Sequence, residues 1–440
     1  MPRIGRRKLL QLSGAGALAA KTGGLATILA SGKAPAFAQG TTVRWLRWND
    51  FVPASDGVLR DQIIPQCAKD LGITLSIEMI NGNDIPARIT AAIQSGTGPD
   101  IICALNLAPQ LYPDSVADVS DVVEQIGKDQ GGFYGASRLV ANNGKKWLGV
   151  PWCILGNQNA YRKSWFEAIG LSKFPETWDE YREAGRKLKA KGQPIGQALG
   201  HSFGDPPTFW YPYLWSFGGK EVEQDGKVAL DSKATVESVK YAVAFWRDCC
   251  DEGGLAWDDS SNNRAFLAGT ISSTLNGASI YLEAKRKPDT YSTEKGTPLW
   301  QDILHGALPK GPAGAFAYHL PMTNLMMGYS KQQDAAKKFL AWIASMAVYR
   351  AWFDSQQGYS VGATTVWEQD PLWQKDPVML PFRQAARAGQ LPGYAGPTDR
   401  RAAESFSKYI IVDMYAKAVQ GMSAEDAVKW AAGEVQKIYA

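Results

Sequence analysis

The chain has 440 residues, 45% of them hydrophobic and 20% charged, which is typical of a globular protein and not of a disordered one. Its net charge of +4 depends on residues 1–38, which hold six basic and no acidic side chains; the remainder has 41 basic and 43 acidic residues. This balance, without a basic patch, argues against nucleic acid as a partner. About 400 remaining residues exceed what one hydrophobic core usually serves, so two lobes are expected.

Residues 1–38 are typical of a twin-arginine signal peptide. Arg6 and Arg7 precede a stretch rich in Gly and Ala, and Ala36-Phe37-Ala38 offers a small-x-small cleavage site. Lys21 makes the stretch too polar for a stable membrane span. No cysteine follows the cleavage site, so a lipid anchor is not expected. We therefore predict a soluble protein, exported to the periplasm by the twin-arginine route.

From residue 41 the chain alternates between strand and helix patterns. Apolar patterns predict strands at 43–48, 73–80 and 101–104, with helices at 58–71 and 85–94 between them. This order implies a parallel sheet with right-handed crossovers, and ligands bind outside the carboxyl ends of such strands. The polar and aromatic residues that follow these strands are predicted to meet the ligand: Trp48, Asn49, Asp50, Asn83, Asp84 and Asn106.

The stretch 147–165 is predicted to cross between the lobes. Pro151 fixes its own φ and favours an extended conformation at Val150. Such a segment suits a hinge, because few residues absorb the change in dihedral angles. Trp152 and Asn157 would then face the enclosed ligand. The alternative is an ordinary buried strand with a proline at its edge, and this stretch alone leaves both interpretations open.

Helical patterns dominate the remaining residues. Thr177 as N-cap and Glu180 at position N3 predict a capping box at the start of a helix that runs towards residue 192. The densest aromatic stretch is 209–217, and a long amphipathic helix is expected at 231–250. These segments would form the second lobe.

No common cofactor or metal motif is present in the sequence. The three histidines lack the spacing of metal ligands, and neither Cys-x-x-Cys nor Gly-x-Ser-x-Gly occurs. Asp258 and Asp259 are the obvious couple for glycoside hydrolysis, but adjacent residues point apart in regular structure. We expect no cofactor, no metal and no enzymatic activity, with a secreted glycoside hydrolase as the alternative.

The number of cysteines, five, rules out complete intramolecular pairing. Cys67 and Cys103 fall within apolar patterns and are most simply small core residues. One disulfide is compatible with an oxidising compartment, and the sequence leaves its partners open.

Aromatic and amide side chains favour a carbohydrate ligand. A pyranose stacks its C–H faces on Trp or Tyr, and its hydroxyls need directional partners such as Asp, Asn and Arg. A single aromatic residue is more often part of the core, so the prediction depends on how many of them stand at loop positions. The predicted stacking platforms are Trp152 and Trp210, and Tyr211 and Tyr394 are further candidates.

Several short motifs follow one another along the chain in a characteristic order: Gly98-Pro99-Asp100-Ile101-Ile102, Gly149-Val150-Pro151, Asn159-Ala160-Tyr161-Arg162-Lys163, Pro175-Glu176-Thr177-Trp178-Asp179-Glu180 and Leu275-Asn276-Gly277. Together they resemble the extracellular solute-binding proteins of ABC-type sugar importers, a family similar to the maltose-binding protein. Arg162 and Ser164 depart from that family's usual Asn and Asp. Ser279 stands where Trp is common, which puts one stacking position in doubt, and Tyr281 is its expected replacement.

The resemblance implies an α/β fold of two lobes, each a mainly parallel sheet flanked by helices, with the ligand cleft between them. The amino-terminal lobe would comprise 41–150 and 321–358, and the carboxyl-terminal lobe 151–320 and 359–440. Further ligand contacts implied by the family are Asn276, Tyr281, Tyr318, His319 and Arg400.

The same resemblance implies a function. A monomeric periplasmic receptor would capture a mono- or oligosaccharide or a polyol and deliver it to the permease subunits of an ABC importer in the inner membrane. The identity of the sugar stays open.

Overall fold

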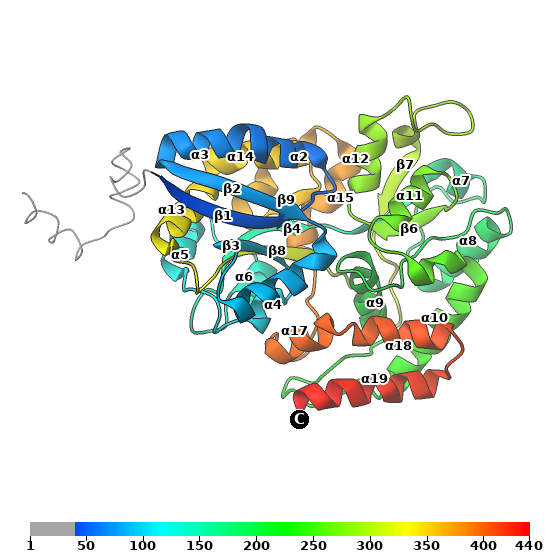
Figure 1. The fold of residues 1–440 in the computed structure, drawn as a ribbon. Helices are drawn as coiled ribbons and strands as arrows, with labels where there is room; N and C mark the ends of the chain where they lie inside the picture. Colours follow the sequence, from blue (N-terminus) through cyan, green and yellow to red (C-terminus); the bar gives the residue numbers. More distant parts are fainter. Residues whose placement is uncertain (1–39) are drawn as a thin grey trace, which may run out of the picture.

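The computed structural model describes residues 40–440, which form two lobes (Figure 1). The predicted signal peptide at 1–38 lies outside the described residues. The first lobe is built on a six-stranded sheet in the order β2-β1-β3-β8-β4-β9. Its strands are β1 (Thr41–Trp48), β2 (Ile73–Ile80), β3 (Ile101–Leu105), β4 (Val150–Leu155), β8 (Leu320–Met326) and β9 (Ser360–Gly362).

The strand directions in this sheet are mixed. β1 is parallel to β2 and β3, as predicted, but β8 is antiparallel to both β3 and β4, and β9 is antiparallel to β4. The prediction of a mainly parallel sheet is therefore wrong for this half of the sheet. The reason is connectivity: β8 follows the return of the chain from the second lobe, so it starts at the edge where β1, β3 and β4 end.

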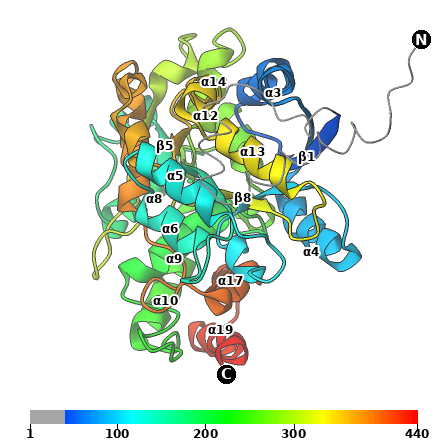
Figure 2. The ribbon, with the colours of Figure 1, turned by 90° about the vertical axis from the view of Figure 1, so that its left-hand side faces the viewer.

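Helices cover both faces of the six-stranded sheet. In Figure 1, α2, α3 and α14 lie above it and α4 and α6 lie below it. Figure 2 shows α5 beside α13, which it contacts. The helices around this sheet are α2 (Pro53–Val58), α3 (Ile64–Leu71), α4 (Ile85–Ser95), α5 (Ser120–Asp129), α6 (Gly135–Ala141), α13 (Gln333–Ile343), α14 (Met346–Gln356), α15 (Leu380–Arg383) and α16 (Ala385–Ala388).

The second lobe has a three-stranded sheet in the order β6-β5-β7. Its strands β5 (Gln158–Arg162), β6 (Ser273–Asn276) and β7 (Ile303–Gly306) are all antiparallel, which corrects the prediction of a parallel sheet here too. The helices of this lobe are α7 (Lys163–Glu167), α8 (Trp178–Lys189), α9 (Asp205–Ser216), α10 (Lys233–Cys249), α11 (Ser261–Leu267), α12 (Ser279–Arg286), α17 (Arg400–Ser407), α18 (Ile410–Val419) and α19 (Ala424–Tyr439).

Sequence features explain how α8 begins and why α9 lies in the interior. α8 starts with the predicted capping box: the Thr177 hydroxyl accepts from the Glu180 N–H, and the Glu180 carboxylate accepts from the Thr177 N–H. α9 is different, because every residue from Asp205 to Ser216 is buried. A helix that is apolar all round belongs in the interior, so α9 forms the centre of the second lobe.

The chain passes between the two sheets along three segments. The first is residues 156–157 between β4 and β5, the second is 307–319 between β7 and β8, and the third follows α16. β4 and β9 lie in the first sheet, whereas the borders predicted at 150 and 359 assigned them to the second lobe. Leu155 of β4 pairs with Leu320 of β8, so the first two crossings run side by side.

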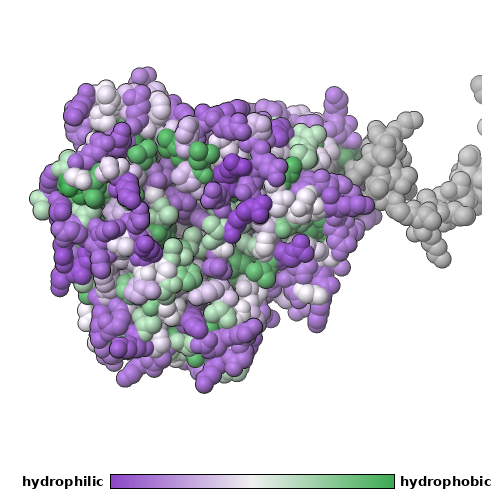
Figure 3. All heavy atoms as spheres, turned by 180° about the vertical axis from the view of Figure 1, so that it is seen from behind, coloured by the Kyte–Doolittle hydropathy of each residue, from purple (hydrophilic) through white to green (hydrophobic). Residues whose placement is uncertain are grey.

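The five cysteines all lie within the described residues, are buried, and form no disulfide. On the face shown in Figure 3, hydrophobic side chains occur in small areas among hydrophilic ones. Over residues 40–440, no helix combines the length and the apolar character needed to cross a membrane. Within the same range, no group of three or more His, Cys, Asp or Glu side chains could hold a metal ion.

Candidate functional site

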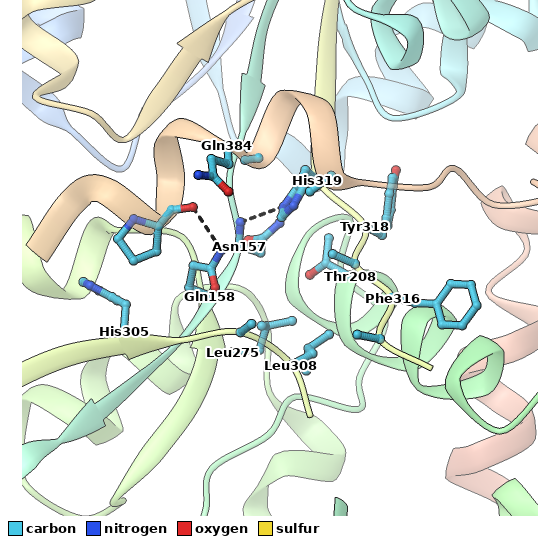
Figure 4. A pocket seen from close by; sticks show the side chains of 16 residues that line it. Asn157, Gln158, Thr208, Leu275, His305, Leu308, Phe316, Tyr318, His319 and Gln384 are labelled. Atoms are coloured by element: carbon cyan, nitrogen blue, oxygen red, sulfur yellow. Dashed lines mark hydrogen bonds between the residues drawn. The ribbon is translucent and has the colours of Figure 1, made fainter. Parts of the chain in front are cut away.

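Two cavities adjoin the paired crossing segments, and Asn157 lines both. The narrower one, which we call the cleft, has a volume of about 20 Å³ and lies between the lobes. The wider one, which we call the hinge cavity, has a volume of about 350 Å³ and is shown in Figure 4. The cleft is lined by Trp48, Phe51, Leu155, Asn157, Phe203, Gly204, Asp205, Asp259, Asn276, Gly277, Ser279, Leu320 and Tyr359.

Aromatic side chains form one wall of the cleft. Trp48 ends β1, and its ring makes edge contacts with Phe51 at 5.5 Å and with Phe203 of the second lobe at 5.6 Å. Only 2% of Trp48 is exposed, and its indole N–H has no hydrogen-bond partner among the described residues. Tyr359, which precedes β9, completes this wall. The wall offers apolar faces together with an unused donor.

Polar side chains line the rest of the cleft. Asp205, the first residue of α9, accepts hydrogen bonds through Oδ2 from the amides of Asn262, at 2.6 Å, and Asn276, at 3.3 Å. Asn276 in turn donates to Asn263 Oδ1 and accepts from the Ser279 hydroxyl. Because each amide is held by a neighbour, this part of the cleft presents acceptors and donors in fixed positions.

Asp259 anchors the start of α9. Its carboxylate accepts from the backbone N–H groups of Gly204 and Asp205 and from the Ser202 hydroxyl. Burial raises the pKa of Asp259 to about 6, and burial together with the Asp259 charge raises the pKa of Asp205 well above its usual value. Among residues 40–440, neither carboxylate forms an ion pair, and no Lys, Arg or His lines the cleft. The cleft is therefore rich in acceptors and carries negative charge.

The lobes touch each other at the margin of the cleft. Asn106 donates from Nδ2 to the Phe203 carbonyl at 2.8 Å, and the Asn83 side chain accepts from the Phe203 N–H at 3.1 Å. The Tyr318 hydroxyl donates to Asn106. A Cβ on Gly82 would come within 2.2 Å of the Phe203 ring, so glycine permits this approach. These contacts define a closed arrangement of the lobes.

The structure brings seven of the predicted ligand contacts to the space between the lobes. Trp48, Asn157 and Asn276 line the cleft, and Asn157, Tyr318 and His319 line the hinge cavity. Asn83 and Asn106 hold Phe203 at the margin. Asp50 lies behind the cleft, where it accepts from the Val52 N–H and from the Gln356 amide. Tyr281, the expected replacement for tryptophan, instead donates to Asp376 and lines neither cavity.

The two predicted stacking platforms lie in the hydrophobic cores and line neither cavity. Trp152 is 1% exposed and packs against Trp45, Tyr349 and Trp352 in the first lobe. Trp210 is fully buried in the second lobe, and its ring stacks on that of Tyr415. The physical reason is position: β4 is buried along its whole length, and α9 is buried on all sides.

The remaining predicted contacts also line neither cavity. Tyr211 is buried within α9, and Tyr394 packs against Trp215. The others are exposed: Asn49, Asp84 and Arg400.

Sequence reasoning missed several cleft residues. Phe51 and Phe203 stand in loops beside small or polar residues, which was the signal already used for Trp48. Asp205 precedes two prolines at the start of a helix, a favoured place for an acidic residue. No signal in the sequence indicated that its partners would be Asn262 and Asn276.

We expect the buried carboxylate of Asp50 to make stability depend on pH. Burial raises its pKa from 3.8 to about 6. An acid whose pKa is raised by folding contributes stability below its unfolded pKa, and this contribution is lost as the pH rises from about 4 to 6. Relative to the wild type, Asp50→Asn should therefore gain about 2 kcal/mol of unfolding free energy between pH 4 and pH 7. Urea unfolding at both pH values measures this difference, and a difference independent of pH would contradict it.

Comparison with known proteins places the chain in a family. Residues 62–381, more than half of the chain, match the model of the bacterial extracellular solute-binding protein family. The chain belongs to this family. Its members are binding proteins, in agreement with the two-lobed architecture and the cleft between the lobes.

Individual relatives support the same placement. A putative binding protein of Brucella abortus is 25% identical over 301 residues, which cover 66% of this chain and 69% of the relative. A probable amino-acid ABC transporter periplasmic-binding protein of Sinorhizobium fredii is 28% identical over 217 residues, 48% of this chain and 46% of the relative. The solved structure of maltose-bound MalE3 of T. maritima superposes with a TM-score of 0.76 and 20% identity, covering 90% of this chain and all of that one.

Proposed function

We propose that this solute-binding protein captures a neutral carbohydrate, either a mono- or oligosaccharide or a polyol, and delivers it to an ABC importer. The observation that carries the proposal is the composition of the cleft. The aromatic side chains of Trp48, Phe203 and Tyr359 line the same cleft as the fixed polar groups of Asp205 and Asn276. Sugar rings need both kinds of surface, because their C–H faces are apolar and their hydroxyls are directional donors.

The charge of the cleft argues against an amino acid, the ligand named for the Sinorhizobium relative. An α-carboxylate needs a cationic or multiple N–H partner when it leaves water. Among the described residues no Lys, Arg or His lines the cleft, and the Asp259 carboxylate would repel an anion. A neutral ligand meets neither obstacle, and the maltose bound by the MalE3 structure belongs to that class.

Binding without chemistry also fits the cleft carboxylates better than glycoside hydrolysis does. The Asp259 carboxylate accepts a hydrogen bond from the backbone N–H of Gly204, directly before α9. The carboxylate of its neighbour Asp258 accepts from the Ser260 and Ser261 hydroxyls. Hydrolysis needs two carboxyl groups free to flank the scissile bond. We therefore assign Asp205 a binding role only.

Lobe movement completes the proposed cycle. We assign residues 41–155 and 320–388 to one lobe and 158–319 and 389–440 to the other, with the crossings as hinges. The cleft of this closed arrangement, about 20 Å³, has room for about one water molecule, so the contacts through Phe203 would break in the open form and the cleft would widen to admit the ligand. Export by the twin-arginine route, a periplasmic location, a monomeric state and permease subunits as partners remain parts of this proposal.

A thermal-shift screen tests the ligand class. A ligand that binds only the folded state stabilises it by about 4 kcal/mol at a thousandfold excess over Kd, which should raise the melting temperature by several degrees. We expect hits among neutral sugars or polyols and none among amino acids, peptides, phosphates or metal ions. Hits confined to amino acids or phosphates would refute the carbohydrate proposal and leave only the family and fold.

A further inference from the structure

We propose that the hinge cavity is a second binding site, separate from the cleft, for a small neutral molecule with an apolar body and a hydroxyl group. Its volume of about 350 Å³ falls within the range of small-molecule sites. It is lined by Asn157, Gln158, Thr208, Leu275, His305, Ala307, Leu308, Ala315, Phe316, Ala317, Tyr318, His319, Pro381, Gln384, Ala385 and Ala388.

The two cavities are separated by the crossing segments. Leu155 and Leu320, which pair between β4 and β8, line the cleft, whereas Gln158, three residues after Leu155, and His319, which precedes Leu320, line the hinge cavity. Asn157 is the residue common to both linings, and its N–H donates to His319 Nδ1 at 3.1 Å (Figure 4). A molecule in the hinge cavity would therefore occupy a different compartment from the transported ligand.

The lining of the hinge cavity is neutral and mostly apolar. It contains no Lys, Arg, Asp or Glu, and burial lowers the pKa of His305 and His319 to about 4, so both rings are uncharged at neutral pH. Leu275, Leu308 and Phe316 present apolar surface. Because a charged group buried here would find no partner of opposite charge, the cavity selects against ions.

A few polar groups in the wall are left for an occupant. His319 accepts from Asn157 through Nδ1, so its ring proton lies on Nε2, and no described residue accepts from it. Gln158 donates from Nε2 to the Pro381 carbonyl, which leaves its Oε1 as an acceptor without a described partner. One donor and one acceptor in an apolar space match a hydroxyl group, which can both accept and donate.

Three probes of similar shape test whether the hinge cavity binds a neutral molecule in preference to an ion. Benzyl alcohol is neutral, benzoate is an anion and benzylamine is a cation at neutral pH. Titrated into the full-length mature protein and followed by ligand-observed NMR, benzyl alcohol should bind at least about tenfold more tightly than either ion. Equal binding of all three probes would overturn the proposal, because a nonspecific surface would not discriminate among them.

Variants that fill the cavity locate the binding. Ala317→Leu and Ala388→Leu each add apolar volume from a different segment of the chain, and either should weaken benzyl alcohol binding about fivefold or more. Ala313→Leu is the matched control, because Ala313 is exposed on the same loop as Ala317 and lies outside the cavity. Binding that survives both filling variants would place the probe elsewhere and refute the assignment.

The proposal also requires that a ligand in the cleft does not block binding in the hinge cavity. Saturation with the best carbohydrate of the thermal-shift screen should leave the benzyl alcohol site available, and so should Asp205→Asn. Competition between benzyl alcohol and the carbohydrate would show that they share one site. This result would overturn the proposal of a second site. Failure of the screen itself would affect the proposed function and not this test, since the probes and the filling variants need no carbohydrate.

Discussion

Asp205→Asn should lose ligand affinity by about 10- to 100-fold while keeping its stability. The substitution preserves volume but replaces a carboxyl oxygen in the cleft with an amide NH2 group, and a buried ligand hydroxyl left without its acceptor costs about 1–3 kcal/mol. Burial and Asp259 raise the pKa of Asp205, so its ionised form is costly in the folded state at neutral pH. Removing that charge should leave the melting temperature unchanged or higher. Calorimetric titration with the carbohydrate identified by the screen, together with thermal unfolding, measures both effects.

Asp258→Asn is the control for this experiment. Asp258 is near in sequence to the cleft residue Asp259, but it bonds to Ser260 and Ser261 and does not line the cleft. Its substitution should change affinity by no more than about twofold, within the usual range for a surface position. Equal loss of affinity in both variants would mean that general electrostatics, and not contact with Asp205, determines binding.

Trp152→Ala should destabilise the protein by about 3–5 kcal/mol, the usual cost of removing a buried aromatic side chain from a core. The ring is 1% exposed and contacts Tyr349 at 4.7 Å and Trp352 at 4.6 Å between ring centroids. Since its indole N–H has no partner among the described residues, the loss comes from packing and from the contact of the Arg47 guanidinium, which lies over the ring at 5.5 Å. Denaturant unfolding gives the free energy, and titration of the protein that remains folded should give unchanged affinity.

Trp430→Ala provides the comparison for this loss of stability. Trp430 is only partly buried on α19, where Lys417 lies over its ring at 4.6 Å. We expect a clearly smaller loss of stability than for Trp152. The opposite pattern, in which Trp152→Ala leaves stability intact and abolishes binding, would restore Trp152 as a ligand contact.

Local signals in the sequence were reliable for the fold, whereas contacts between distant residues were not. The alternation of β1, β2 and β3 with helices and the capping box at Thr177 depend on residues close in sequence, and the structure confirms them. The antiparallel insertion of β8 depends on pairing with β3, more than 200 residues away, which no local pattern encodes.

The same distinction explains the outcome for the candidate site. Trp48 stands at the end of a strand and lines the cleft, whereas Trp152 lies inside β4, a strand buried on both faces. Such strands show no alternation between apolar and polar residues, so the sequence could not tell which way Trp152 points. Asp205 was missed because its role depends on Asn262 and Asn276, which reach it only in the folded chain.

The position of the paired crossings has a consequence for how binding strength can evolve. A rotation about two adjacent strands that widens the space on one side narrows the space on the other, and Asn157 borders both spaces. Under the proposed lobe movement, side chains such as Ala385, on the side away from the cleft, would bias the balance between the open and closed forms without contacting the ligand. Related receptors with identical cleft residues could thus differ widely in affinity, because of substitutions at positions that do not contact the ligand.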